Sequence, residues 1–156
     1  MKRSIVALCS VALMACSTAS TEDATTDEAK ASEPTPITQQ DVEGITNAMF
    51  NALKAGDAAA YASHFSSDGA FISARGKVEG QQAIQEFWAD ANKGGAAKNL
   101  DLKTVKWATS GDVAWALGEY TGGVTAPEGN TLTVLQRQPD GTLKVLAQAS
   151  IPKPAK

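Results

Sequence analysis

The residue whose chemistry is simplest to specify is His64, the only histidine in the chain. An imidazole with an ordinary pKa of about 6.5 can act as a general acid or base near neutral pH. His64 follows Tyr61 by three residues, so on a helix both side chains would share one face and could point toward the mouth of a pocket. The sequence offers no carboxylate that can be assigned to orient the imidazole. A structural or hydrogen-bonding role therefore stands beside a catalytic or ligand-contacting one.

Glu119 is the second candidate base, because it interrupts an otherwise apolar stretch. Residues 113–124 are typical of a strand, and alternation places Val113, Trp115, Leu117 and Glu119 on one face and Ala114, Ala116, Gly118 and Tyr120 on the other. If Glu119 faces a pocket, burial would raise its pKa and make it a general base. If it faces outward, it is a surface or interface charge.

Aromatic side chains could surround these two candidates. Phe71, Trp88 and Trp115 are large enough to line a ligand cavity, although aromatic residues in a small domain usually pack in its core. The candidate ligand pocket comprises Tyr61, His64, Phe71, Trp88, Trp115 and Tyr120. A single histidine cannot form a multi-histidine metal site, and the only cysteines are Cys9 and Cys16, so we expect neither a metal centre nor a cofactor.

The N-terminus indicates export. Lys2 and Arg3 precede a short apolar run, which is typical of a secretory signal and too short to span a membrane. The run ends in Leu13-Met14-Ala15-Cys16, which resembles a bacterial lipobox. That resemblance implies a signal peptide over 1–15, cleavage before Cys16 and acylation of this cysteine. The alternative is an ordinary secreted protein in which Cys16 is incidental. Because Ser17 follows Cys16 where an Asp would retain the protein, we expect the outer membrane, on its periplasmic side, if the host has one.

Residues 16–36 are predicted to form a disordered tether, since they are rich in Ser, Thr, Ala and acidic residues and poor in apolar ones. Between residues 17 and 36 there are five acidic residues and one lysine, a net charge of −4. The remaining residues, 37–156, carry twelve acidic and eleven basic side chains, a net charge of −1. A nearly neutral domain without a basic stripe is not expected to bind nucleic acid.

The domain over 37–156 is predicted to be of the α+β class. Its first helix should begin after the N-cap Thr38, with Asp41 in a capping box and Ile37 and Val42 as a hydrophobic staple, and should end near Gly56. Further helices are expected over 58–65 and from Gly80 to about 91. A turn at 66–69 and a short strand at 70–73 separate them. Four strands should follow, at 100–107 (with a bulge), 113–124, 130–138 and 143–151.

Several stretches together resemble the SnoaL-like branch of the nuclear-transport-factor-2-like superfamily, which includes ketosteroid isomerases. They are GDAAAY at 56–61, HFSSDGAF at 64–71, VEGQQAIQEFW at 78–88, GDVAW at 111–115 with GEY at 118–120, and LTVLQRQPDG at 132–141. The resemblance implies a cone-shaped, curved antiparallel sheet wrapped around N-terminal helices (a cystatin-like roll). It also implies a pocket at the wide end and a dimer formed through the outer sheet face. Leu143 stands where relatives commonly have Trp, so local packing should differ.

Three functions remain open at this point. The first is a lipid-anchored envelope protein whose domain, without catalysis, binds a small apolar ligand or forms a homodimer. The second is an enzyme of the isomerase, cyclase or hydratase type with His64 or Glu119 as base and a tyrosine as donor. The third is a structural docking module. No Asp lies at a position that matches the catalytic acids of ketosteroid isomerases, so the resemblance does not imply isomerase activity.

Overall fold

The computed structural model describes residues 35–124 and 126–154. The predicted signal peptide, the lipidation site Cys16 and nearly all of the predicted tether lie outside these residues. None of the helices in the described ranges combines the length and the apolar character needed to cross a bilayer.

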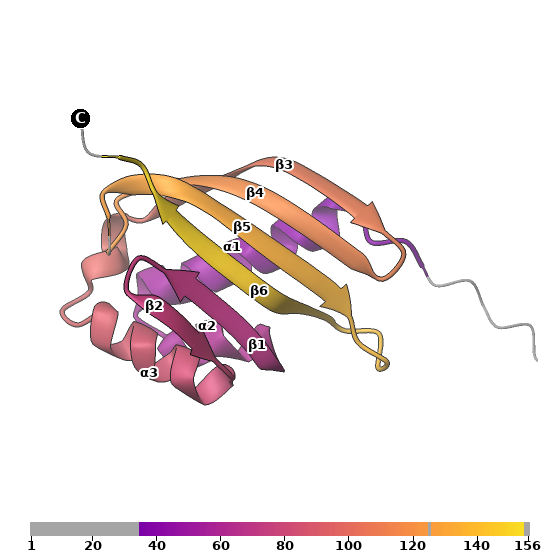
Figure 1. The fold of residues 1–156 in the computed structure, drawn as a ribbon, viewed down its shortest axis with the longest axis horizontal. Helices are drawn as coiled ribbons and strands as arrows, with labels where there is room; N and C mark the ends of the chain where they lie inside the picture. The colour runs from indigo at the N-terminus through magenta and orange to yellow at the C-terminus, as the bar shows by residue number, and fades with distance from the viewer. Residues whose placement is uncertain (1–34, 125, 155–156) are drawn as a thin grey trace, which may run out of the picture. The chain divides into compact units, whose positions relative to one another are not determined.

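One mixed, six-stranded, curved sheet forms the body of the domain (Figure 1). Its strands lie in the order β2-β1-β6-β5-β4-β3. Their bounds are β1 Phe65–Ser73, β2 Gly76–Glu79, β3 Asp101–Ser110, β4 Val113–Thr121, β5 Glu128–Arg137 and β6 Leu143–Pro152. Neighbouring strands are antiparallel except for β1 and β6, which are parallel. The predicted α+β architecture is therefore confirmed, and the sheet departs from a wholly antiparallel one in this single pairing.

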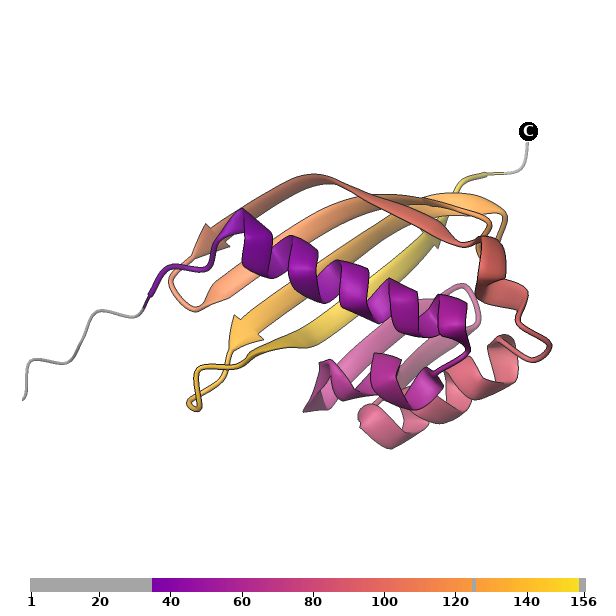
Figure 2. The ribbon, with the colours of Figure 1, turned by 180° about the vertical axis from the view of Figure 1, so that it is seen from behind.

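The helices cover the concave face of the sheet. They are α1 Gln39–Ala55, α2 Ala58–Ser63, α3 Gln81–Ala91 and the single 3-10 turn η1 Ala96–Asn99. Figure 2 shows α1 lying across the sheet, with α2 and α3 grouped over the β1–β2 end. The core lies between these two layers, and Val42, Met49 and Leu53 of α1 are fully buried in it.

Both ends of α1 follow from local sequence, as predicted. The Thr38 hydroxyl accepts a hydrogen bond from the Asp41 backbone N–H, and the Asp41 carboxylate accepts one from the Thr38 N–H, which completes a capping box. The Thr38 N–H and hydroxyl both donate hydrogen bonds to the Asp41 carboxylate, and these two bonds lower the pKa of Asp41. At the other end Gly56 adopts a left-handed conformation with φ of 79°, which a residue without a Cβ accepts at little cost.

The prediction for residues 65–69 is wrong. Phe65 begins β1 instead of ending a helix, and the expected turn at 66–69 lies within that strand. The strand is held by groups distant in sequence: the Gln81 side chain donates to the Phe65 carbonyl at 2.6 Å, and β6 pairs alongside from Val145. The register shifts between Phe65 and Ala70, so the turn-like residues are accommodated as an irregularity of the strand.

The later strands agree more closely with expectation. β3 contains the predicted bulge, because the register with β4 shifts between Thr104 and Lys106. The short strand β2 and the turn η1 were not predicted. Four residues of β2 show no alternation that could identify them in a sequence, and β2 forms only because β1 lies beside it.

Candidate functional site

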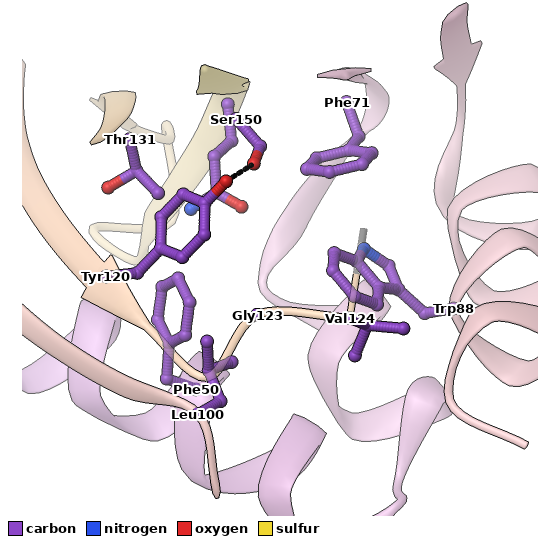
Figure 3. Close-up of a pocket in the computed structure, with 10 residues that line it drawn as sticks. Phe50, Phe71, Trp88, Leu100, Tyr120, Gly123, Val124, Thr131 and Ser150 are labelled. Carbon is purple, nitrogen blue, oxygen red and sulfur yellow. Dashed lines mark hydrogen bonds between the residues drawn. The ribbon is translucent and has the colours of Figure 1, made fainter. Parts of the chain in front are cut away.

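A small cavity lies between the concave sheet face, α1 and the segment that follows β4 (Figure 3). Its space open to water is about 20 Å³, little more than one water molecule requires. The lining is mostly apolar or aromatic and includes no carboxylate or imidazole from the described part of the chain. The lining residues are Phe50, Phe71, Trp88, Leu100, Tyr120, Gly123, Val124, Thr131, Gln148 and Ser150.

Phe71, Trp88 and Tyr120 from the predicted pocket set come together here. Phe71 and Trp88 lie on one side of the cavity and Tyr120 on the other, as Figure 3 shows. The Phe71 and Trp88 ring centroids are 5.2 Å apart. This distance is typical of tilted aromatic pairs. The Trp88 Nε1 atom is buried and has no hydrogen-bond partner within the described residues.

Two glycines allow Tyr120 to occupy its place. A Cβ at Gly123 would lie 2.6 Å from the Tyr120 ring, and one at Gly129 would lie 2.5 Å from the Tyr120 hydroxyl oxygen. Real side chains do not approach so closely, so only glycine fits at either position. The Tyr120 hydroxyl accepts a hydrogen bond from the Ser150 hydroxyl at 3.3 Å, marked in Figure 3.

Tyr61 lies behind the cavity and supports it through a buried polar chain. Its hydroxyl donates to the Gln148 side-chain carbonyl, and the Gln148 amide donates to the Thr133 hydroxyl at 3.0 Å. Tyr61, Gln148 and Thr133 are each at most 1% exposed. Burial raises the pKa of Tyr61 well above its ordinary value, so the phenol is neutral near pH 7.

His64 does not reach the cavity. It is the C-cap of the short helix α2, where its backbone carbonyl accepts a hydrogen bond from the Val145 N–H at 2.9 Å. Burial lowers the pKa of His64, and the positive charge of Lys144 lowers it further. The imidazole is therefore neutral near pH 7, beside a lysine and away from the aromatic cavity lining.

Glu119 and Trp115 lie on the convex face of the sheet, away from the cavity. Strand β4 alternates as predicted, with Ala114, Ala116 and Tyr120 buried while Glu119 is exposed. Trp115 is half-buried on the same outer face as Glu119, and the Lys106 ammonium lies 5.9 Å from its ring centroid. Both side chains face away from the cavity because α1 covers the alternate residues of the strand.

Several residues that line the cavity were not predicted, among them Phe50, Thr131 and Gln148. A signal for Gln148 was present, since it is a polar residue in the mostly apolar stretch 143–151. Phe50 gave no such signal, because an apolar residue on a helix is expected in the core. It lines the cavity only because of where α1 crosses the sheet. Within the described ranges, no three His, Cys, Asp or Glu side chains are grouped as a metal ion would require.

The convex sheet face carries two continuous apolar rows across the strands. One row runs through Ile72, Ala149, Leu132 and Leu117, which are successive cross-strand partners. The other runs through Ala70, Ala147, Val134, Trp115 and Ala108. Ile72 is 44% exposed and Leu132 is 39% exposed, and Ala149 lies between them in the row, so the exposed surface of the row is apolar throughout.

A curved sheet that packs its concave face on a long helix around a small internal cavity defines the nuclear-transport-factor-2-like class, also described as cystatin-like. The model of the SnoaL-like domain family matches residues 46–142, and the chain belongs to this family. No curated protein matches the chain by sequence.

Solved structures with this fold are similar to the domain. A domain of unknown function with a cystatin-like fold from Nostoc punctiforme aligns with a TM-score of 0.65 and 18% identity, over 76% of this chain and 81% of that one. An NTF2-like protein from Novosphingobium aromaticivorans aligns with a TM-score of 0.62 and 14% identity, over 75% and 82%. A nuclear transport factor 2-like superfamily protein from Salmonella enterica aligns with 0.57 and 15%, over 75% and 92%. At these identities the likeness establishes the fold alone.

Proposed function

We propose that this protein is a lipid-anchored protein of the bacterial cell envelope whose domain binds a small, largely apolar ligand without catalysing a reaction. The observation that carries the proposal is the chemistry of the inner cavity. Its walls are formed by aromatic and aliphatic side chains such as Phe71, Trp88 and Val124, with a few hydroxyl and amide groups. Apolar walls with a few polar groups are typical of small-molecule sites.

The placement of the candidate bases favours binding over catalysis. A general base must reach the proton that it abstracts, directly or through one water molecule. His64 caps α2 and Glu119 lies on the convex sheet face, so neither lines the cavity. The enzyme alternative would need another base in this part of the molecule, or a substrate site elsewhere on the domain.

Ligand binding is tested with toluene, a small apolar probe, added to the mature chain carrying Cys16→Ser so that the protein is free of lipid. Because the space open to water is only about 20 Å³, toluene can enter only when the side chains of the wall move apart. We expect one saturable site, detected by calorimetry or by chemical-shift changes at Phe71 and Trp88. Val124→Trp should fill the cavity and abolish binding, whereas Val105→Trp, on the exposed edge strand β3, should leave it unchanged. Equal binding by both variants would contradict an inner site.

Lipid anchoring is a separate part of the proposal and is supported by the lipobox-like residues 13–16. The full chain expressed in a Gram-negative bacterium should incorporate labelled palmitate and sediment with membranes, and Cys16→Ser should abolish the incorporation. Cys9→Ser should leave the sedimentation unchanged, because this residue is predicted to be removed with the signal peptide. Incorporation of labelled palmitate by Cys16→Ser would contradict anchoring through this cysteine.

A second candidate function is self-association through the convex face, for which the two apolar rows are the specific observation. A second copy is the occupant that we propose, as the family resemblance implies. Leu132→Glu places a charge in the centre of one row and should convert a dimer to a monomer in sedimentation velocity. Ala89→Glu adds the same charge on the exposed side of α3 and should leave the dimer intact. A monomeric parent chain would exclude this role.

A further inference from the structure

A second concave region adjoins the inner cavity on the outside of α1. It lies between this helix and the start of β3, and its space open to water is about 100 Å³. Asn47, Asn51 and Lys54 line it from successive turns of α1, on one face of the helix. Asp101 lines it from the first position of β3. We call this region the α1–β3 groove.

The groove and the inner cavity share a wall. Phe50 and Leu100 line both of them and are 8% and 4% exposed. Figure 3 shows these two side chains together at one edge of the cavity, next to Tyr120. A rotation of the Phe50 ring away from Leu100 would therefore join the two spaces, and the volume that the ring leaves would extend the cavity.

The two spaces differ in chemistry. The cavity side is aromatic and aliphatic, whereas the groove presents two carboxamides, one ammonium group and one carboxylate. The charges of Lys54 and Asp101 are opposite, so the groove offers no net charge to a ligand. Each of the two amides can both donate and accept hydrogen bonds. This combination matches a neutral polar group better than an ion of either sign.

We propose that the groove and the inner cavity form one site for an amphipathic ligand with a neutral amide or hydroxyl head group. The head group lies in the groove against Asn47 and Asn51, and the apolar chain passes Phe50 into the cavity. The inference rests on the proposed ligand-binding function, and it adds the class of ligand and the route of entry. It also explains how a cavity with room for one water molecule can accept a larger molecule.

The test compares probes that share an eight-carbon chain: octanamide, octanoate and octylammonium. Titrations use the mature chain with Cys16→Ser, and toluene, which has no head group, serves as a probe that forms no hydrogen bond with the groove amides. We expect octanamide to bind roughly threefold more tightly than either ion, the effect of one hydrogen bond to an exposed amide for which water competes. Asn51→Leu should weaken octanamide binding by a similar factor and leave toluene binding unchanged.

Two further variants test the shared wall and serve as controls. Phe50→Leu keeps an apolar side chain but shortens it, so octanamide should associate faster than with the parent chain. Phe50→Ala should extend this effect if the variant folds. Gln85→Leu removes an exposed amide on α3 and should change neither probe.

The outcomes distinguish failure of the composite site from failure of ligand binding in the inner cavity. If toluene binds and Asn51→Leu selectively weakens octanamide, the composite site is supported. Suppose that toluene binds, but that Asn51→Leu leaves the affinity for octanamide unchanged or that the three eight-carbon probes bind equally well. The composite site is then overturned, while the cavity function remains. If neither toluene nor octanamide binds, the proposed function fails and the inference fails with it.

Discussion

The two faces of the central strands reverse the usual relation between side-chain size and burial. The middle of the concave face of β4 and β5 is buried but is built from small or polar residues: Ala114, Ala116, Gly118, Thr131 and Thr133. Larger buried side chains stand only toward its ends, at Tyr120 and Leu135. The convex face is partly exposed but is built from large apolar residues: Trp115, Leu117, Leu132 and Val134. Hydrophobicity alone would therefore assign the core to the wrong side of the sheet.

The reason is the helix that crosses the concave face. Small side chains let the α1 layer approach the strands closely, and close packing leaves no room for larger ones. The face is also crowded within the sheet itself: at Gly118 an added Cβ would lie 2.7 Å from the hydroxyl oxygen of Thr131, its partner on the neighbouring strand β5. On the convex face no described element covers the strands, so large side chains are tolerated there. The self-association proposed above would cover them.

The largest expected effect contrasts two neighbours in β1 that face opposite ways. Phe71 is 1% exposed and Ile72 is 44% exposed. Phe71→Ala should cost about 3–5 kcal/mol of unfolding free energy, because it removes a buried ring and leaves a cavity. Ile72→Ala should cost only about 1 kcal/mol, since roughly half of its side chain is already in water.

Urea unfolding at several protein concentrations measures both values. If Ile72→Ala proves as costly as Phe71→Ala in the monomer, the contrast between the two faces is broken. A cost for Ile72→Ala that rises with protein concentration would instead sharpen the contrast, because it would show that the convex face is buried in an assembly.

The next effect concerns the polar chain buried behind the cavity. Gln148→Leu leaves the Tyr61 hydroxyl without its acceptor, and an unsatisfied buried hydroxyl costs about 1–3 kcal/mol. Adding Tyr61→Phe to Gln148→Leu should recover part of that loss, because the second change removes the unsatisfied group. A double-mutant cycle by chemical denaturation measures the coupling, and strictly additive costs would contradict the hydrogen bond.

A smaller effect is expected from removing the N-cap of α1, the helix that covers the concave face. Thr38→Ala removes the N-cap of α1 and should lower the unfolding free energy by about 1 kcal/mol. Thr38→Ser keeps a capping hydroxyl and serves as the matched control. Neither change should alter self-association in sedimentation velocity, because the cap lies away from the convex rows. A changed association constant would link the two faces energetically.

The smallest effect is the pH dependence contributed by His64. Its pKa is lowered in the folded chain, so the unfolded chain takes up the proton first as the pH falls. The stabilisation is therefore complete above the unfolded pKa of about 6.5 and is lost as the pH falls toward the folded value. His64→Gln should reduce the loss of stability between about pH 7 and about pH 5.

Lys144 provides a second handle on this pH dependence. Lys144→Met removes the nearby charge and should bring the folded pKa of His64 closer to its ordinary value. The dependence of the unfolding free energy on pH should therefore become weaker but not vanish, because burial still lowers the pKa. Unfolding free energies at three pH values suffice for the comparison. Identical slopes in the parent chain and in His64→Gln would contradict a depressed histidine pKa.

Features that depend on nearby residues could be predicted from the sequence. The capping box of Thr38 and Asp41 and the left-handed Gly56 involve groups within a few residues, so their sequence signals suffice. The alternation of β4 was equally legible, because the side chains of an extended strand must point to opposite faces. The family resemblance added the order of the elements and their curved arrangement.

Features that depend on distant residues could not be predicted in this way. The segment Ser66-Ser67-Asp68-Gly69 has the composition of a turn, yet β6 pairs beside it and draws it into a strand. The six predicted pocket residues share an aromatic or ionisable character, but only Phe71, Trp88 and Tyr120 line the cavity. The type of a side chain does not indicate which way it faces in the packed domain.

The sequence by itself determined where α1 begins and ends, how β4 alternates and which residues could do chemistry. These properties arise from local hydrogen bonds and from the repeat of the backbone. Only the tertiary structure decided that Glu119 faces outward, that Gln148 supports a cavity and that Phe50 separates it from a polar groove. Each of these depends on which strand face α1 covers, and that choice is made by long-range packing between segments far apart in the chain.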